Sequence, residues 1–336
     1  MVGENIAKIF ERYMIFFVLA SIAAGTVTGL LAPEFSQGLR VFINLTIFLM
    51  LFPMMVGIRV DEIFKAAKNI KALSWSVVLN FIVSPLVGLL VASLALGRHP
   101  DFAVALFLLS VTPCAGMVAG WTGFARGNVP LALVIVALSL TLSIFTIPPS
   151  MYLLARSLVA INAAAMFKGT LLVILLPMIA GDLARRLIIK VWGEPGFQSV
   201  RPMLPPLSML GMFGIIFISV SMGAHRIISG WQSILVIVPA LLTFYLIQIS
   251  FSLWLAQKSG LAARDVVALV YSVSGKNISL AIALASQFFS PLTVVMLAIN
   301  PLVQMPTMAA LLRWLPRLYD KEKSSPDSAN NQGSRS

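Results

Sequence analysis

Residues 266–288 read VVALVYSVSGKNISLAIALASQF, an apolar run long enough to cross a lipid bilayer as one helix. At its centre, Gly275, Lys276 and Asn277 interrupt the run with a flexible residue, a basic residue and an amide. Interrupted apolar helices of this kind are typical of membrane proteins that bind a ligand near the middle of the bilayer. The stretch therefore indicates both a fold class and the position of a candidate site.

The composition of the whole chain agrees with a membrane protein. Of its 336 residues, 59% are hydrophobic and 11% are charged, whereas soluble domains are about 25% charged. We predict an all-α polytopic membrane protein with ten transmembrane helices. The expected spans are roughly 14–33, 41–59, 74–96, 103–122, 130–154, 168–184, 204–224, 232–256, 266–288 and 292–314.

Lysine and arginine are distributed unequally between the two sides of this arrangement. Eighteen of the 24 lie before the first span, after an even-numbered span or in the tail, and five lie on the opposite side. The excess predicts that both termini are cytoplasmic and that the protein is a multi-pass protein of the cell membrane. The net charge of +12 then serves insertion into the lipid bilayer, and no basic face with interleaved aromatic residues indicates a nucleic-acid partner.

Ten spans divide into two five-helix repeats of opposite orientation, residues 1–167 and 168–316, followed by a polar tail, 317–336, that we expect to be disordered. Span 4 contains TPCAGMVAGW at 112–121, and span 9 contains SVSGKNIS at 272–279. Both strings are rich in glycine and small polar residues within apolar surroundings. Corresponding interruptions in two halves predict broken helices 4 and 9 beside a binding site, although glycines also occur where helices merely pack closely, as we expect for Gly25 and Gly29.

Lys276 is the one basic residue that falls in the middle of a span, and none of the twelve carboxylates lies at that depth. A charged group at the bilayer centre costs about 2.5–3.5 kcal/mol on insertion scales and indicates a functional site. Three states of Lys276 are open: a neutral amine, an ammonium held by helix C-terminal carbonyls, or an ammonium that binds an anionic substrate. A purely structural lysine tied to the carbonyls of the span 4 break is the alternative to a functional one.

The candidate binding residues lie in the spans that surround the two interruptions. They are Asn80, Cys114, Ser272, Ser274, Lys276, Asn277, Asn300 and Gln304. Cys114 is either a small buried apolar side chain or a substrate ligand at the span 4 interruption. As the one cysteine, it excludes a disulfide framework, and the sequence indicates no metal site, no cofactor and no enzyme active site. It does not indicate an oligomeric state.

Five motifs occur in order along the chain and resemble those of the bile acid:sodium symporter superfamily, most closely its arsenite efflux permease branch. They are MLFPMMVGIRVDEI at 50–63, LNFIVSPL at 79–86, TPCAGMV at 112–118, GKNISLAIALA at 275–285 and NPLVQMP at 300–306. FARGNVPLAL at 124–133 resembles the bile-acid branch instead. The resemblance implies ten helices in two inverted repeats. A core of spans 3–5 and 8–10 would pack on a panel of spans 1, 2, 6 and 7, with broken spans 4 and 9 crossing.

The resemblance also bears on the coupling ion. In the symporters a glutamate and a glutamine of span 9 hold sodium, and the aligned residues here are Ser272 and Lys276. The other aligned ligand positions lack a side-chain oxygen: Val118, Ala119, Ala132 and Val136. We therefore expect transport without sodium coupling, with Lys276 either standing permanently in place of the bound cation or supplying a coupling proton.

The resemblance implies a substrate class through two residues. In the arsenite branch a span 4 cysteine and a span 10 glutamate are linked to transport; Cys114 matches the first, and Gln304 replaces the second. We expect a secondary transporter that exports arsenite or a similar small oxyanion or neutral oxyacid by alternating access. The alternative is transport of an organic anion, a monocarboxylate or a bile-acid-like molecule, paired with Lys276. A channel is a third option, which the paired broken helices disfavour.

Overall fold

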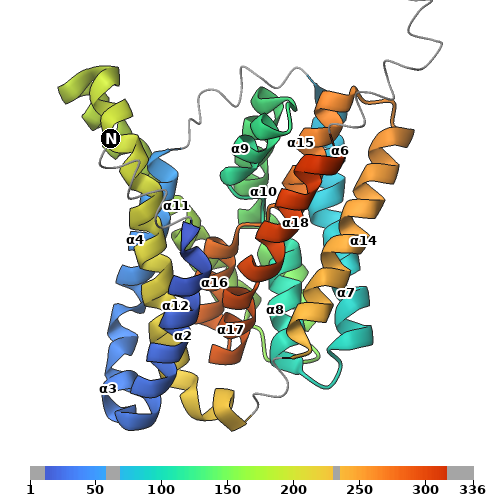
Figure 1. Ribbon diagram of the computed structural model, residues 1–336. Coiled ribbons are helices and arrows are strands. Elements are labelled where there is room, and N and C mark those ends of the chain that lie inside the picture. Colours follow the sequence, from blue (N-terminus) through green and yellow to red (C-terminus); the bar gives the residue numbers. More distant parts are fainter. Residues whose placement is uncertain (1–11, 58–68, 230–234, 316–336) are drawn as a thin grey trace, which may run out of the picture.

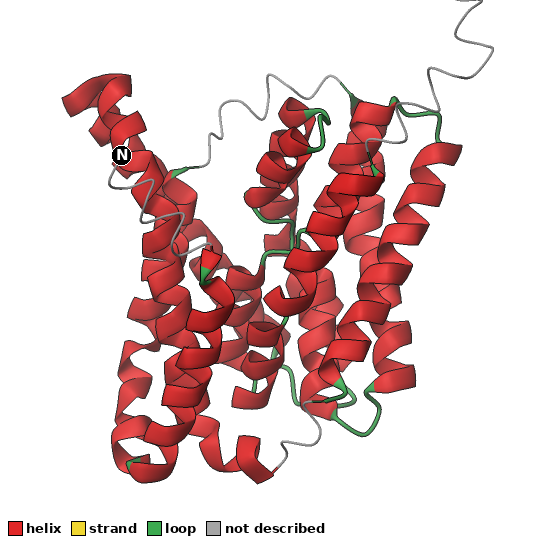
Figure 2. Ribbon diagram, viewed as in Figure 1, coloured by secondary structure: helices red, strands yellow, loops and turns green. Residues whose placement is uncertain are grey.

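The computed structural model describes residues 12–57, 69–229 and 235–315, and the statements below concern these residues. Two expectations fall outside them: the disordered tail 317–336, and the basic and acidic end of the motif at 50–63. Within the described ranges the chain consists of helices joined by turns and loops, as Figure 2 shows. The predicted all-α class is confirmed.

The first half of the described chain contains ten helical elements. They are α2 (Met14–Leu31), α3 (Pro33–Gly38), η1 (Leu39–Phe42), α4 (Ile43–Val56), α6 (Ile70–Val78), η2 (Leu79–Val83), α7 (Ser84–Ala95), α8 (Pro100–Val111), α9 (Met117–Phe124) and α10 (Val129–Ala155). The second half contains eight more. They are α11 (Ala163–Val200), η3 (Arg201–Met203), α12 (Leu204–Ser229), α14 (Ile237–Lys258), α15 (Ala263–Ser274), α16 (Ile278–Phe288), α17 (Pro291–Ile299) and α18 (Pro301–Trp314).

Seven helical stretches of the described chain are long and apolar enough to cross a membrane. They are Met14–Leu31, Pro33–Val56, Ile70–Ala95, Val129–Ala155, Ala163–His225, Ile237–Lys258 and Pro291–Trp314. The apolar helices α8 and α16 are shorter, because each adjoins an interruption of the chain. The protein is therefore a polytopic α-helical membrane protein.

The long stretch Ala163–His225 consists of two antiparallel helices, as their neighbours on α4 reveal. Gly169 lines a cavity with Asn44, Gly181 packs on Met55, Gly211 packs on Met50, and Gly214 packs on Thr46. Along α11, residues with higher numbers lie against residues of α4 with higher numbers. Along α12 the order is reversed, so α12 runs antiparallel to α4. The chain therefore reverses between the two helices, near Gly193, whose φ of 70° suits glycine.

The helices form two groups, which we call the panel and the core. The panel contains α2, α3, α4, α11 and α12, and the core contains α6 to α10 and α14 to α18. Figure 1 shows the panel on the left and the core on the right. Within the panel, α2 approaches α12 closely because a Cβ on Gly25 would lie 2.8 Å from the carbonyl oxygen of Phe217, and Gly29 is tighter still against Ser221. The prediction that Gly25 and Gly29 serve helix packing is confirmed.

Two carboxylates mark the opposite ends of the core. Asp265, in the first turn of α15, accepts hydrogen bonds from Asn69 Nδ2 (2.5 Å) and Asn128 Nδ2 (2.7 Å). Asp101, in the first turn of α8, accepts one from the hydroxyl of Ser290. Asn69, Asn128 and Ser290 are the N-cap residues of α6, α10 and α17, so each carboxylate fixes the start of a neighbouring helix. We call these ends of the bundle the Asp265 end and the Asp101 end.

Candidate functional site

Both interruptions expected from the sequence are present at the middle of the core. Between α8 and α9 the backbone becomes extended at Thr112 (ψ 148°), because the following Pro113 disfavours the helical conformation of its predecessor and supplies no N–H. Between α15 and α16 the helix ends at Gly275, which has non-helical dihedral angles (φ −90°, ψ 61°). The helices that lead into the breaks are deeply buried, since every residue of 102–111 and of 265–274 is buried.

The two interruptions lie side by side and pair through their backbones. The N–H of Ala115 donates to the carbonyl of Gly275 (2.8 Å), and the N–H of Asn277 donates to the carbonyl of Pro113 (2.9 Å). These bonds make Cys114 and Lys276 partners in an isolated antiparallel bridge. Backbone groups released from helices inside a membrane need partners within the protein, and here each break supplies them to the other.

Lys276 extends from this bridge to the C-terminal end of α8. Its Nζ lies 3.1 Å from the carbonyl oxygen of Ser110, 3.3 Å from that of Thr112 and 3.2 Å from Oδ1 of Asn80. The side chain is completely buried, and no ion pair of the described residues includes it. A protonated lysine has three N–H donors, so protein oxygens satisfy all of them.

Of the three states considered for Lys276, this geometry fits an ammonium held by helix C-terminal carbonyls. The carbonyls of Ser110 and Thr112 belong to the last turn of α8 and its C-cap, where the helix dipole is negative. A positive charge on Lys276 would therefore meet a partial negative charge and three oxygen acceptors, without a carboxylate among the described residues. A substrate anion would have to displace or supplement these bonds to reach the ammonium.

Asn80 links Lys276 to the helix that precedes the second break. It lies in η2, a single π-helical turn between α6 and α7, and such turns are frequent at functional sites. While its Oδ1 accepts from Lys276, its Nδ2 donates to the carbonyl of Ser76 (3.0 Å) and to Oγ of Ser272 (3.3 Å). The Ser272 hydroxyl itself donates to the carbonyl of Leu269. The structure thus brings Asn80, Ser272 and Lys276, three of the candidate residues, into one hydrogen-bonded group.

Ser274 and Asn277 lie on either side of the second break. The Ser274 hydroxyl donates to the carbonyl of Val270 (2.7 Å), so it caps its own helix and does not point to Lys276. Asn277 is the N-cap of α16, with its Oδ1 accepting from Leu280 N (3.0 Å). Its Nδ2 faces Sδ of Met54 on the panel at 3.9 Å. Asn277 is therefore the residue of the break whose amide reaches from the core towards the panel.

Gln304 forms a hydrogen bond to the backbone of the second break, and Asn300 in turn forms one to Gln304. Gln304 Nε2 donates to the backbone carbonyl of Lys276 (3.2 Å), and its Oε1 accepts from Asn300 Nδ2 (2.8 Å) and from the hydroxyl of Tyr245 (3.0 Å). All these side chains are buried. Tyr245 is not among the residues predicted from the sequence, because one tyrosine in an apolar span resembles ordinary core packing. Its position eight residues into α14, on a face that also carries Gln248, is the available signal.

Cys114, the bridge partner of Lys276, contacts a different helix, α10. Its Sγ lies 3.1 Å from the hydroxyl oxygen of Ser139 in α10, and 1% of the residue is exposed. Two residues further on, Gly116 is exposed at the start of α9, and a Cβ added there would meet nothing within 4 Å. The thiol is therefore covered in this conformation, although Gly116, two positions further along the chain, is exposed.

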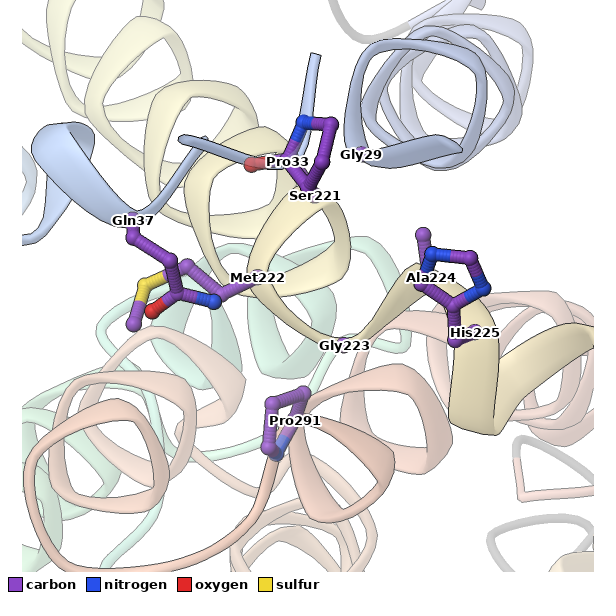
Figure 3. Close-up of a pocket in the computed structure, with 9 residues that line it drawn as sticks. All are labelled: Gly29, Pro33, Gln37, Ser221, Met222, Gly223, Ala224, His225 and Pro291. Carbon is purple, nitrogen blue, oxygen red and sulfur yellow. The ribbon is translucent and has the colours of Figure 1, made fainter. Parts of the chain in front are cut away.

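Two further features bear on the candidate residues: possible metal sites and cavities. Among the described residues, no group of three His, Cys, Asp or Glu side chains is placed to hold a metal ion. Two cavities, of about 370 Å³ and about 540 Å³, lie between the panel and the core, and Figure 3 shows the first. Neither is lined by any of the eight candidates, so the polar centre is a packed network in this conformation.

The fold and its polar centre define a class: polytopic helical membrane proteins whose two interrupted helices meet inside the bundle, an arrangement found in secondary transporters. The sequence profile of the Sodium Bile acid symporter family matches residues 44–231, which is more than half of the chain. The chain belongs to this family, and it is a membrane transporter.

Full-length relatives carry related names. The Arsenical-resistance protein Acr3 of Corynebacterium glutamicum is 22% identical, over 96% of this chain and 94% of that protein, and the Acr3 of Alkaliphilus metalliredigens is 25% identical, over 92% and 95%. The uncharacterized sodium-dependent transporter YocS of Bacillus subtilis is 24% identical, over 90% and 92%. The chain is thus similar to arsenical-resistance proteins and to a sodium-dependent transporter, which makes its own substrate and coupling ion the central questions.

Proposed function

We propose that the protein is a secondary transporter that works by alternating access, with ten transmembrane helices in two inverted repeats. The antiparallel pairing of the two breaks supports this topology, because inverted repeats bring corresponding segments together in opposite directions. The two carboxylates add support. Asp265 of the second half binds the N-cap of α10 in the first half, and Asp101 of the first half binds the N-cap of α17 in the second. We place both termini in the cytoplasm and the protein in the cell membrane, on the distribution of lysine and arginine.

We further propose that transport is independent of sodium, and the surroundings of Lys276 carry this proposal. Three oxygens converge on a tethered ammonium, which is what a sodium ion would otherwise require from the protein. Ser272 stands where the symporters have a glutamate, and its hydroxyl is engaged with Leu269 and Asn80. A free cation would have to compete with a covalently attached one that cannot dissociate. Lys276 either fills the cation position permanently or exchanges the coupling proton.

Arsenite, or a similar small oxyanion or neutral oxyacid, is the substrate that the site supports best. Cys114 supplies a thiol at the paired breaks, and the similarity to arsenical-resistance proteins favours a role for it in this chain. Thiol and arsenous acid condense by forming one As–S bond and releasing one water molecule, a reversible step that suits a carrier. Gln304, in place of a glutamate, holds the backbone of Lys276 and exchanges no proton.

An organic anion, a monocarboxylate or a bile-acid-like molecule paired with Lys276, is the alternative. The family assignment favours it, because the profile is that of bile acid symporters. The geometry is less favourable, since all three donors of Lys276 are engaged and the residue is completely buried. Such a substrate would bind where Asn277 faces the panel and would reach Lys276 only after the breaks separate.

A flux assay on everted membrane vesicles that contain the full-length protein separates the two substrates. We expect accumulation of arsenite above that in vesicles without the protein, and no accumulation of acetate, pyruvate or taurocholate. Uptake of one of the organic anions, with none of arsenite, would replace the first proposal by the alternative. No flux of any of these substrates in either direction would contradict both.

A further inference from the structure

The turn between α16 and α17 is a part of the core that packs closely on the panel. Phe288, at the end of α16, lies against Gly169 of α11, where an added Cβ would come within 2.8 Å of the ring atom Cε2 and nearer still to Cζ. Pro291, at the start of α17, lies against Gly223 of α12, where an added Cβ would come within 2.8 Å of Cγ. Gly169 and Gly223 thus leave room for Phe288 and Pro291, which lie on either side of one turn. We call these two contacts the seats of the turn.

Polar contacts fix the same turn in place. Gln287 Nε2 donates to Oδ1 of Asn44 on the panel at 3.1 Å. Within the core, Ser290 donates to Asp101, as described above, so the turn has one attachment to each group of helices. The turn therefore closes the junction of panel and core at the Asp101 end.

The two cavities described above flank this turn. The first is shown in Figure 3, with Pro291 facing Gly223 and the polar side chains of Gln37 and His225 on its walls. The second is lined by Gln287 and Phe288 on the core side and by α4 and α11 on the panel side. Space thus remains on both sides of a narrow contact, which is what a seal between two rigid bodies leaves.

The corresponding turn at the Asp265 end, between α9 and α10, has no such contact with a panel glycine among the described residues. Phe124 ends α9 as Phe288 ends α16, yet Phe124 is 76% exposed. Added Cβ atoms on Gly116 and Gly120 of α9 would meet nothing within 4 Å. Gly57, at the end of α4, would place a Cβ 3.5 Å from the carbonyl oxygen of Met54, with no other atom of the described residues given within 4 Å. Figure 1 shows α9 standing apart from the panel at this end.

We propose that the α16–α17 turn is a gate, which in this conformation seals the Asp101 end by seating Phe288 on Gly169 and Pro291 on Gly223. The proposal rests on the alternating access proposed above and identifies the conformation as closed at the Asp101 end and open at the Asp265 end. With the orientation given by the basic residues, the closed end is external and the open end cytoplasmic. In the opposite conformation the turn leaves both glycines, and the α9–α10 turn closes on the panel instead.

Cysteine accessibility tests the gate without any substrate. The reporter is Gly120→Cys on a Cys114→Ser background, labelled with a membrane-impermeant maleimide in everted vesicles. We expect rapid labelling. Adding Gly169→Leu or Gly223→Leu fills a seat, disfavours the sealed conformation and should slow labelling about tenfold. The matched control is Gly38→Leu, since a Cβ on Gly38 meets nothing within 4 Å and labelling should not change.

A rescue variant separates the gate from a general loss of folding. Phe288→Ala combined with Gly169→Leu makes room for the new side chain and should restore labelling towards the rate of the reporter alone. Gln287→Leu, which only removes the bond to Asn44, should slow labelling to a smaller extent. Labelling that Gly169→Leu and Gly223→Leu leave as fast as Gly38→Leu does would overturn the gate. Unchanged labelling of these variants together with substrate flux by the wild-type protein would overturn the gate alone, whereas responsive labelling with no flux of any tested substrate by the wild-type protein would contradict the proposed function alone.

Discussion

Replacing Lys276 with methionine is expected to reduce transport to background and to lower the thermal stability of the purified protein by several degrees. The substitution keeps a long unbranched side chain, one atom shorter than lysine, and removes the three donated hydrogen bonds. The carbonyl of Thr112 and the amide oxygen of Asn80 then lack a donor in a buried site, whereas the carbonyl of Ser110 keeps the hydrogen bond from the Ser84 hydroxyl. Each such loss costs about 1–3 kcal/mol, and together they free the end of α8 from the second break.

The measurements are vesicle flux and a thermal unfolding curve in detergent. Lys168→Met is the matched control, because Lys168 is exposed on α11, and it should leave both quantities unchanged. A Lys276→Met protein that transports at the wild-type rate would contradict the central role of this ammonium. Lower stability with normal flux would reduce Lys276 to the structural alternative.

Cys114→Ala is expected to abolish arsenite transport while leaving the fold intact. The residue is buried against Ser139, and alanine fills most of the same space, so the main loss is the thiol itself. Flux of arsenite into everted vesicles should fall to background, and any organic-anion flux should be largely unchanged. Ser139→Ala is the matched control, since it removes the hydroxyl partner and keeps the thiol. Full arsenite transport by Cys114→Ala would show that the thiol has no role.

Much of the fold could be predicted from local sequence, because membrane spans depend on apolar length and breaks depend on Pro and Gly. The breaks after Val111 and after Ser274 lie within the strings quoted from spans 4 and 9. The helix that contains the sixth expected span, 168–184, continues beyond it, towards the reversal near Gly193. The prediction ended at the charged residues, but Arg185 and Arg186 pair with Asp182 at 2.9 and 2.6 Å and continue the helix.

The site was predicted as a set of residues but not as a set of contacts. Local patterns placed Lys276, Asn80 and Gln304 near the interruptions, because polar side chains in apolar spans are conspicuous. They did not indicate that Asn80 reaches Lys276 from a π-helical turn, nor that Gln304 binds the backbone carbonyl of Lys276. Those contacts depend on how separate helices pack. The seats at Gly169 and Gly223 escaped notice for the same reason, since a glycine reveals its neighbour only in three dimensions.

The initial rate of substrate flux in sodium, compared with potassium or choline at the same ionic strength and pH, tests the central claim most directly. The claim is that the ammonium of Lys276 takes the place of a bound cation between the end of α8 and Asn80. Equal rates in the three media are the predicted result. A rate that rises with sodium concentration and saturates would contradict it, because a binding site for sodium would then exist beside an ammonium that we infer has replaced it.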